Sequence, residues 1–394
     1  MHPNFSECIV SISTSLLDNQ EYKQGIISII DNLEYRESAV ERWELFKYKV
    51  KDFSIAFSKH NQNNIRHKIQ IIEREISKID ESCSVDFNLR RKKELENELN
   101  DIYNLKSKGA QIRSRAKWIN DGEQNSKYFL SLEAKNQSSN VIKELAVENN
   151  KTVHSENEIL GEMCKFYEKL YNTASISDTS IDDYLEGETI PQLNNADKDF
   201  LESFPTLDEC KDAVNDMKVN KSPGLDGIPS EFYKCFWESI STIFYQALKE
   251  IFEQEEMSYT QRLSVLTLLF KKGDKKLLKN YRPLSLTNTD YKIIATIFAK
   301  RLQNIICKLI DKSQSAYIKG RYIGENARLI LDIFEYCENN NQDNILLFLD
   351  FEKAFDSVEW NFLFKALRKF NFGEQFLKWI KILYNSPIFR IKNK

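Results

Sequence analysis

The chain has 394 residues, of which 41% are hydrophobic and 29% charged, and its formal net charge is −3. Phe and Tyr are frequent, at 25 and 17 copies, whereas Gly and Pro number 11 and 7, which excludes collagen-like and generally disordered chains. The length suffices for two or three domains. Because no run of about 18 uncharged apolar residues occurs and the N-terminus lacks a leader pattern, we expect an intracellular protein, cytoplasmic or nuclear, without a membrane partner.

Cysteine and charge distributions narrow the function classes. The seven cysteines include no CxxC pair, and the four histidines are not at metal-ligand spacing, so neither a zinc site nor a disulfide framework is predicted. Between Gln261 and Ile330 there are 15 Lys and Arg against 4 Asp and Glu, a local net charge of +11. Such a stretch indicates either a polyanion partner or a solvated charged face.

Residues 60–108 have the pattern of a helical hairpin. Apolar residues recur at spacings of three and four in two runs, around a polar stretch at 80–88 that predicts the turn. The stripe is typical of a core or a coiled-coil seam. Its members are Ile65, Ile69, Ile72, Ile76 and Ile79, then Leu95, Leu99, Ile102 and Leu105.

The segment RSRAKWINDGEQNSKYFLSLEAKN, residues 113–136, interleaves cations with aromatic residues. Arg113, Arg115 and Lys117 can pair with phosphates while the aromatic rings stack on bases. The alternative is a helix whose cations extend over a buried Trp. The sequence leaves both interpretations open.

Residues 172–199 are acidic and rich in Ser, Thr and Asp, which predicts a flexible linker or a peripheral insertion. From about residue 204 the texture becomes α+β, because helical segments alternate with Gly and Pro loops and with apolar runs of strand length at 264–270 and 344–351. The last residues, NSPIFRIKNK, predict an opening strand without a partner.

The apolar run at 344–351 is predicted to deliver one carboxylate, Asp350, to the end of a buried strand, just before a helix that includes Phe355. A carboxylate there suits Mg²⁺, which prefers oxygen ligands. The alternative is a helix N-cap.

Three further stretches give this carboxylate a context. A glycine loop is predicted in residues 221–237, KSPGLDGIPSEFYKCFW, and its free backbone N–H groups can donate hydrogen bonds to a phosphate. Residues 268–302 predict a strand, a basic turn, a strand and a helix, and QSAYIKGRYIGENARLILDIFEY, residues 314–336, predicts a Gly-Arg turn and a helix.

These four stretches, in this order, resemble the opening motifs of the LINE-type, or non-LTR retrotransposon, reverse transcriptases. The matching blocks are SPGLDG, NYRPLSL, QSAYIKGR and FLDFEKAFDSV, and the segment around KWINDGEQNSKYF resembles the region upstream of the polymerase. The resemblance implies an α+β fold, with the fingers and a partial palm of a right-hand polymerase at 204–394. A helical N-terminal extension at 1–140 and a helix with an acidic linker at 141–203 precede it.

The resemblance also implies roles for individual residues. Asp350 is the first catalytic aspartate and binds Mg²⁺, of which the complete enzyme holds two ions. Phe355 is the steric gate against the sugar 2′ position. Arg282 packs on the incoming base of the deoxynucleoside triphosphate or holds its triphosphate, with Lys271 or Lys272 assisting. The residues implied to contact template or other nucleic acid are Lys221, Gly224, Asp226, Gly227, Gln314, Gly320 and Arg321, besides the upstream cations at 113, 115 and 117.

The implied function is RNA-directed DNA synthesis by two-metal nucleotidyl transfer, with an RNA template and a DNA primer as partners. The sequence departs from the family pattern because no Tyr/Phe-x-Asp-Asp tetrapeptide follows Asp350, and the endonuclease and C-terminal regions of the parent polyprotein are absent. We therefore expect a fragment that is inactive alone. The alternatives are a retained nucleic-acid-binding remnant and a decayed copy of the element.

Overall fold

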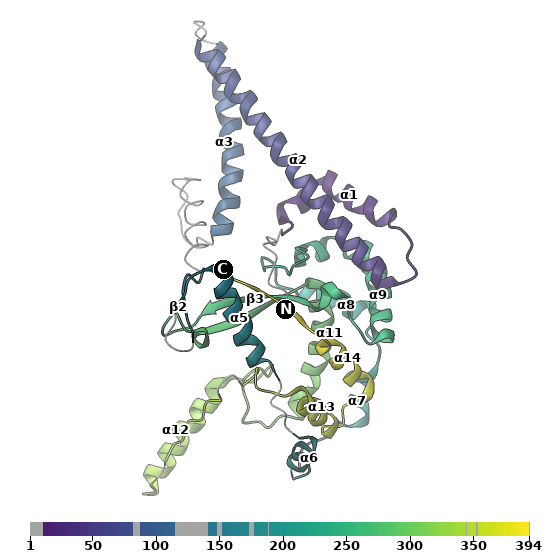
Figure 1. Cartoon of the computed structure of the whole chain (residues 1–394), viewed down its shortest axis with the longest axis vertical. Coiled ribbons are helices and arrows are strands. Elements are labelled where there is room, and N and C mark those ends of the chain that lie inside the picture. The colour runs from purple at the N-terminus through teal and green to yellow at the C-terminus, as the bar shows by residue number, and fades with distance from the viewer. Residues whose placement is uncertain are drawn as a thin grey trace.

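The computed structural model describes residues 11–81, 87–114, 141–147, 152–172, 177–187, 189–343, 345–351 and 354–393. It consists of a helical body, a small three-stranded sheet and two helical projections (Figure 1). This α+β architecture with a helical N-terminal segment is the predicted fold class. No helix in these ranges combines the length and apolar composition needed to cross a bilayer.

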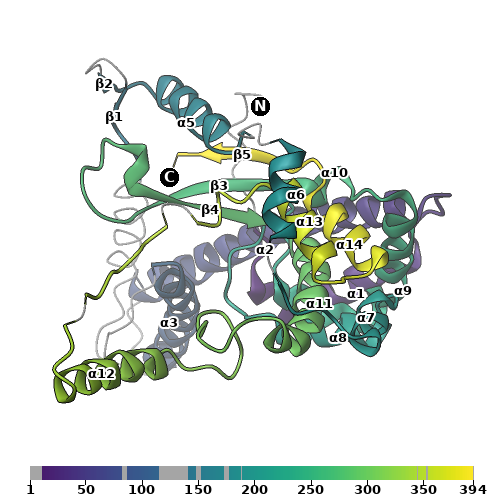
Figure 2. The same cartoon turned by 90° about the horizontal axis from the view of Figure 1, so that it is seen from below.

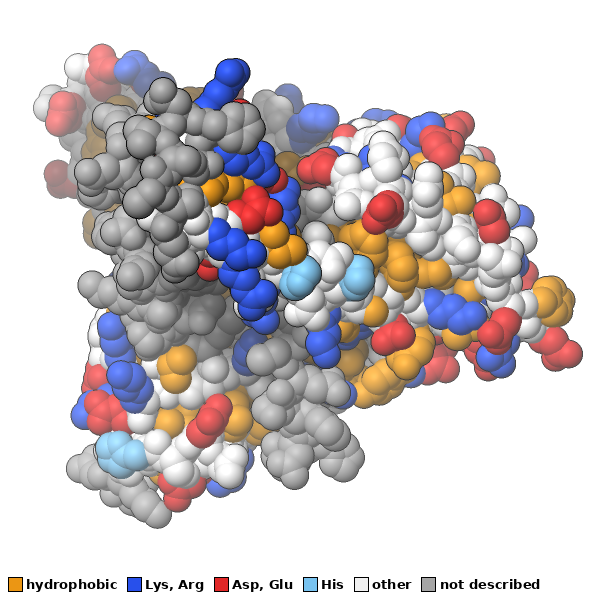
Figure 3. All heavy atoms as spheres, turned by 90° about the horizontal axis from the view of Figure 1, so that it is seen from above, with side chains coloured by type: hydrophobic (Ala, Val, Ile, Leu, Met, Phe, Trp, Pro, Cys, Tyr) orange, Lys and Arg blue, Asp and Glu red, His pale blue; other side chains and the backbone are white. Residues whose placement is uncertain are grey.

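The N-terminal projection is the predicted helical hairpin. It consists of α2 (Ala39–Glu81) and α3 (Phe87–Ser114), which run side by side away from the body in Figure 1. Ile69, Ile72 and Leu95 are buried, while Lys68 pairs with Glu98 at 2.6 Å on the surface. The face seen from above carries Lys and Arg side chains interspersed with Asp and Glu (Figure 3). The coiled-coil interpretation stays a prediction.

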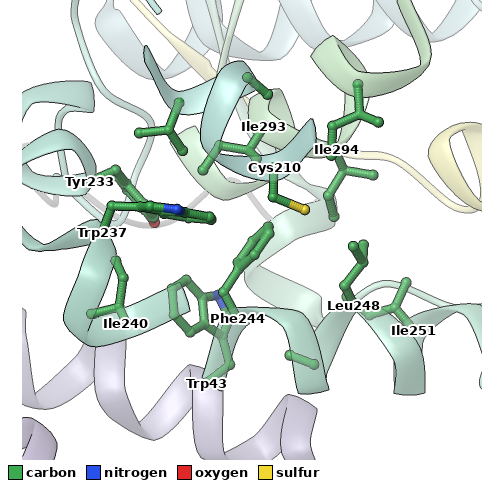
Figure 4. Packing of buried hydrophobic residues seen from close by; sticks show 14 of the residues in the cluster. Trp43, Cys210, Tyr233, Trp237, Ile240, Phe244, Leu248, Ile251, Ile293 and Ile294 are labelled. Carbon is green, nitrogen blue, oxygen red and sulfur yellow. The ribbon is translucent and has the colours of Figure 1, made fainter. Parts of the chain in front are cut away.

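The main core joins the start of α2 to helices far along the chain. Its long central helix is α9 (Ser230–Gln254), whose apolar residues recur at spacings of three and four and which ends at Glu255 in a left-handed conformation. Trp43 of α2 packs edge-on against Phe244 of α9, near Cys210 and Ile293 (Figure 4). The other contributors are η1 (Thr14–Asp18), α1 (Gln20–Asp31), α8 (Leu207–Asp216), α11 (Thr289–Ile305) and α14 (Glu374–Tyr384). One core therefore spans the predicted division near residue 204.

The acidic segment is helical in its described parts. Ser177 caps α6 (Asp178–Glu186) and Asn194 caps α7 (Asn195–Glu202), each by accepting a backbone N–H bond. Asp182 of α6 pairs with Lys365 of α13 (Trp360–Lys369) at 2.8 Å. Capping and pairing thus fix the described residues of these helices on the body, and the interpretation of residues 172–199 as a flexible linker or a peripheral insertion stays a prediction.

The sheet has the order β4-β3-β5. Strands β3 (Leu263–Phe270) and β4 (Tyr281–Thr287) form the predicted antiparallel hairpin with the predicted basic turn between them, and α11 follows. The predicted final strand, β5 (Ile388–Lys392), runs parallel to β3, so the expectation that it lacks a partner was wrong. Next to the sheet, β1 (Leu145–Ala146) and β2 (Thr152–Val153) pair with each other, and α5 (Glu156–Leu170) packs with them in a second apolar cluster.

The second projection is α12 (Ile323–Asn339), which extends from the body in Figures 1 and 2. The residues after it, 345–351, are irregular and exposed, with Phe348 at 77% and Leu349 at 76% exposure. The prediction of a buried strand ending at Asp350 is therefore wrong for these described residues. An apolar strand is stable only when neighbouring strands satisfy its backbone and cover its side chains, and this segment joins no sheet.

The remaining elements are short connections. They are α10 (Tyr259–Arg262), η3 (Leu278–Asn280) and η4 (Ile306–Lys308).

Candidate nucleic-acid and nucleotide site

One face of the sheet is open and carries the predicted triphosphate ligand Arg282. In the antiparallel register Arg282 is opposite Leu269, and Leu284 is opposite Thr267, so these four side chains share a face. Leu269 and Leu284 are 54% and 45% exposed, and Arg282 is exposed. The other face is covered, because Leu268, Tyr281 and Ile391 pack against the second apolar cluster. The sheet therefore presents one accessible surface with a guanidinium on it.

The turn that joins the two strands adds lysines beside this face. Lys271 and Lys272 are exposed, and the Lys271 backbone N–H donates to the Asn280 carbonyl at 2.9 Å, which closes the turn. Gly273 has a φ of +93°, a conformation that side chains other than glycine rarely adopt. Within the described part of the chain no carboxylate pairs with Lys271, Lys272 or Arg282, so this hairpin offers uncompensated positive charge.

Much of the remaining basic stretch is used inside the protein. Arg301 is 3% exposed and donates two hydrogen bonds to the Glu209 carboxylate, at 2.6 and 2.7 Å, and others to nearby backbone carbonyls. Against the effect of burial, Arg301 lowers the pKa of Glu209. Ion pairs to carboxylates also engage Arg262, Lys276, Lys300, Lys308 and Arg328. The local net charge of +11 therefore overstates the positive charge that is available to a partner.

The glycine loop at 221–227 is packed rather than open. Gly224 is buried so closely that a Cβ there would lie 2.0 Å from the Asn288 side chain. The backbone N–H groups of Asp226 and Gly227 donate to Asn288 Oδ1 at 3.3 Å and to the Gly224 carbonyl at 3.2 Å. The expectation of free N–H groups for a phosphate is thus corrected: of the residues predicted to contact nucleic acid here, Lys221 is exposed, while Gly224 and Gly227 are buried.

Asp226 belongs to a buried polar network that the sequence did not reveal. Lys47 of α2 is 3% exposed and pairs with the fully buried Asp290 at 2.8 Å, and Trp43 donates from Nε1 to the same carboxylate at 3.0 Å. Burial and the nearby Asp290 raise the pKa of Asp226 to about 7, against the opposing charge of Lys47. Its Oδ1 accepts from the Ile228 N–H at 3.1 Å, while its buried Oδ2 has no hydrogen-bond partner. The bonds of Lys47 and Trp43 to Asp290 hold α2 against the start of α11.

The loop before α12 is organised by Arg321. Its guanidinium donates to the carbonyls of Gln314 at 2.6 Å, Ile310 at 2.8 Å and Cys307 at 3.3 Å, and also to that of Asp311. Gly320 has a φ of +83°, which this turn requires, and Gln314 is exposed. Among the predicted template residues, Arg321 thus has a structural role, and Gln314 is accessible.

Asp350 and Phe355 lie in the exposed segment between α12 and α13. Phe355 is 79% exposed and precedes α13 by five residues, so the predicted helix begins later than expected and Phe355 is no core residue of it. Its ring meets that of Tyr317 edge-on, with centroids 5.8 Å apart. Tyr171, at the C-terminal end of α5, has its pKa raised to about 12 by burial first and by the charge of Asp356 second. Asp356 therefore lies near the end of α5.

The carboxylate of Asp350 is a suitable ligand for a hard divalent cation. Within the described ranges, however, no group of three or more His, Cys, Asp or Glu side chains is placed to hold a metal ion. A two-ion site needs several oxygen ligands about the two cations. The described residues therefore do not fit such a site, although Asp350 fits the place of one ligand.

The upstream cations fall at and beyond the end of α3. Arg113 lies in the last turn of α3, and Arg115 and Lys117 lie outside the described residues. The sequence patterns indicated no role for Tyr317, although this residue lies within the QSAYIKGR block.

Comparisons with known proteins agree with these motifs. Residues 270–394 match the family described as reverse transcriptase (RNA-dependent DNA polymerase). The chain is 32% identical over 351 residues to the Transposon TX1 uncharacterized 149 kDa protein of Xenopus laevis, an alignment that covers 87% of this chain and 26% of that protein. It is 29% identical over 157 residues to the Retrovirus-related Pol polyprotein from type-1 retrotransposable element R1 of Bradysia coprophila, covering 39% of this chain and 15% of that one. The chain thus spans about a quarter or less of the length of these relatives.

Proposed function

We propose, because the chain belongs to the LINE-type reverse transcriptases, that it forms the nucleotide-binding part of an RNA-directed DNA polymerase. The observation that carries the proposal is the family match over residues 270–394, which includes the hairpin cations, the Arg321 loop and Asp350. In the proposed reaction a primer 3′-hydroxyl attacks the α-phosphorus of a deoxynucleoside triphosphate paired with an RNA template. A new bond forms between the 3′-oxygen and the α-phosphorus. The bond from the α-phosphorus to the oxygen that bridges it to the β-phosphate breaks, and pyrophosphate leaves.

The β3–β4 hairpin binds and orients the triphosphate in this proposal. Arg282 lies on the open sheet face, and Lys271 and Lys272 extend the positive charge along the adjoining turn. Such cations hold a polyphosphate in one orientation and offset its charge as the leaving group departs. Uncompensated cations serve this role best, because they lose no existing ion pair when the ligand binds.

Base pairing with the template selects the nucleotide, so the protein is expected to recognise the sugar and the backbone. Phe355 is proposed to lie under the sugar, where its exposed ring blocks a ribose 2′-hydroxyl. Its 79% exposure leaves the ring available to a ligand.

Divalent cations, when bound, would lower the pKa of the attacking hydroxyl and neutralise charge on the phosphates. Asp350 is proposed as one of their ligands. Since the described residues do not fit a two-ion site, the role assigned to the others is limited to binding and positioning.

The test is primer extension by an extended polypeptide, in which this chain is followed by a downstream segment that carries a Tyr/Phe-x-Asp-Asp turn. With an RNA template, a DNA primer, deoxynucleotides and Mg²⁺, we expect extension that Asp350→Ala abolishes. The matched control is Asp343→Ala, which removes another exposed carboxylate from the same connecting segment and should leave extension unchanged. Equal activity of the two variants would contradict the assignment of Asp350. Extension by the chain without the added segment would instead contradict the expectation that the fragment is inactive alone.

A further inference from the structure

Two exposed aromatic rings contact each other across two separate motifs. Tyr317 comes from the loop before α12, and Phe355 follows Asp350 by five residues. Their ring centroids are 5.8 Å apart and their planes are at 87°, the edge-to-face arrangement that aromatic pairs favour. The two rings are 86% and 79% exposed, so general burial does not explain why they meet.

The backbone at Tyr317 is held in an uncommon conformation. Its φ is +62°, in the left-handed region, which costs free energy for a bulky side chain and persists only where the surroundings fix it. Arg321 stabilises the loop that contains Tyr317, because its guanidinium donates to four backbone carbonyls between residues 307 and 314. Asn326 adds a bond to the Ser313 carbonyl at 2.8 Å. These bonds tie down the chain just before Tyr317.

Gly and Asn adopt this φ at a lower cost in free energy than a bulky residue does. Gly320, three residues on, does so with a φ of +83°. Tyr317 instead has a large ring in the strained position, and that ring lies against the proposed sugar-contacting residue. The arrangement is suited to restrict the position of the Phe355 ring.

We propose that Tyr317 is a positioning residue for Phe355, through which the Arg321 loop sets discrimination between deoxyribonucleotides and ribonucleotides. The inference rests on the proposed function for the place of Phe355 under the sugar. Tyr317 acts through Phe355: by contacting one edge of its ring, it limits the ring's movement away from a 2′-hydroxyl. The contact and the selectivity can be tested separately.

The contact is tested in the chain as it exists, by ¹⁹F NMR with 3-fluorotyrosine incorporated at position 317. Phe355→Val should shift the fluorine resonance, because the shielding from the neighbouring ring is lost. Fluorotyrosine at position 322 is the control, since Tyr322 is also exposed, at 70%, and lies five residues further along. A resonance at 317 that Phe355→Val leaves in place would overturn the inference.

Selectivity is tested in the extended polypeptide by comparing deoxynucleotide with ribonucleotide incorporation. Tyr317→Asn keeps the left-handed backbone and removes the ring, and should lower the preference for deoxynucleotides by about 2- to 10-fold, the factor that one aromatic pair supplies. Tyr317→Phe should retain the preference, and so should Tyr322→Asn, which places a good N-cap residue before α12.

The two failures are distinguishable. If Phe355→Val leaves the preference unchanged, the proposed sugar contact fails, and this inference fails with it. If Phe355→Val lowers the preference while Tyr317→Asn does not, the inference alone is overturned and the assignment of Phe355 stands.

Discussion

The glycine loop at 221–227 and the segment at 345–355 lie in stretches that both resemble family motifs, yet their described residues differ in burial. In the first, Gly224 is buried, and the Asp226 carboxyl contributes one buried oxygen without a partner beside Lys47 and Asp290. In the second, Leu349 and Phe355 are more than three-quarters exposed, and the described residues of the segment form no strand. Motif membership therefore does not tell which residues reach a ligand.

The difference teaches where each motif residue exerts its effect. A buried charge contributes through the ion pairs that compensate its desolvation, so its replacement should change stability. An exposed residue in few contacts contributes little to stability, so its replacement should change ligand binding or selectivity. Each of the following variants tests on which side of this division a residue lies.

The largest effect is expected from Lys47→Met, which leaves the Asp290 carboxylate buried without its cation. Lys47 and Asp290 are 3% and 0% exposed, and removing one partner of a buried pair costs about 3 to 5 kcal/mol. The free energy of unfolding, from urea denaturation followed by circular dichroism, checks this. The control Lys68→Met breaks the exposed pair with Glu98 and should cost less than about 1 kcal/mol. Similar losses in both variants would refute the division.

The second prediction concerns pH. The pKa of Asp226 is raised from 3.8 to about 7, by burial first and by Asp290 second, so the folded protein holds a proton that the unfolded chain loses near pH 4. Between these values the folded state binds more protons, and stability must fall as pH rises, by up to about 1.4 kcal/mol per pH unit. Above pH 7 this contribution is constant.

Asp226→Asn removes the titrating group while its side-chain oxygen can still accept the Ile228 N–H. Relative to this variant, the parent should lose stability from pH 5 to pH 7, as measured by urea unfolding at each pH. The other charged groups around the site, Lys47, Glu44, Asp290 and Lys292, are present in both proteins. A difference that is independent of pH would show that Asp226 ionises normally.

Predictions from the sequence succeeded where the structure depends on residues close together in the chain, and failed where it depends on distant residues. The β3–β4 hairpin followed from short apolar runs flanking a basic turn, because a two-stranded unit needs only its own residues. The strand ending at Asp350 failed since a buried strand depends on partners that the local pattern does not contain. The Lys47–Asp290 pair joins residues 243 positions apart, and no local spacing indicates such a contact.

Charge counting failed in part for the same reason. Lys300 and Arg301 have no acidic residue next to them in the sequence. The fold nevertheless pairs Lys300 with Asp216 and Arg301 with Glu209. Family resemblance picked out the blocks that contain Lys271 and Arg321, whereas the structure shows that Lys271 is exposed and that Arg321 is bonded to backbone carbonyls.

The third prediction uses this difference between exposed and internally bonded cations to test RNA binding. Replacing Lys271, Lys272 and Arg282 together with Ala should weaken binding to RNA of any sequence and reduce the slope of log K against log salt by about 2 to 3, the value for three lost phosphate contacts. The matched control replaces Lys300, Lys308 and Arg328, which lie in the same basic stretch but are paired to carboxylates. Fluorescence anisotropy between about 50 and 200 mM salt measures both. Equal slopes for the two triple variants would mean that the hairpin is not the binding surface.

The smallest effect on stability is expected at Phe355. Its ring is 79% exposed and touches Tyr317, so Phe355→Ala should lower the free energy of unfolding by less than about 1 kcal/mol. Phe232→Ala provides the contrast, because that ring is fully buried in the main core and its truncation should cost about 3 to 5 kcal/mol. In the extended polypeptide Phe355→Ala should nevertheless raise ribonucleotide incorporation, since the ring that excludes a 2′-hydroxyl is gone. Urea unfolding and the ratio of deoxy to ribo incorporation together decide the matter. A variant that unfolds as early as Phe232→Ala but keeps the parent ratio would make Phe355 a packing residue and remove it from the nucleotide site.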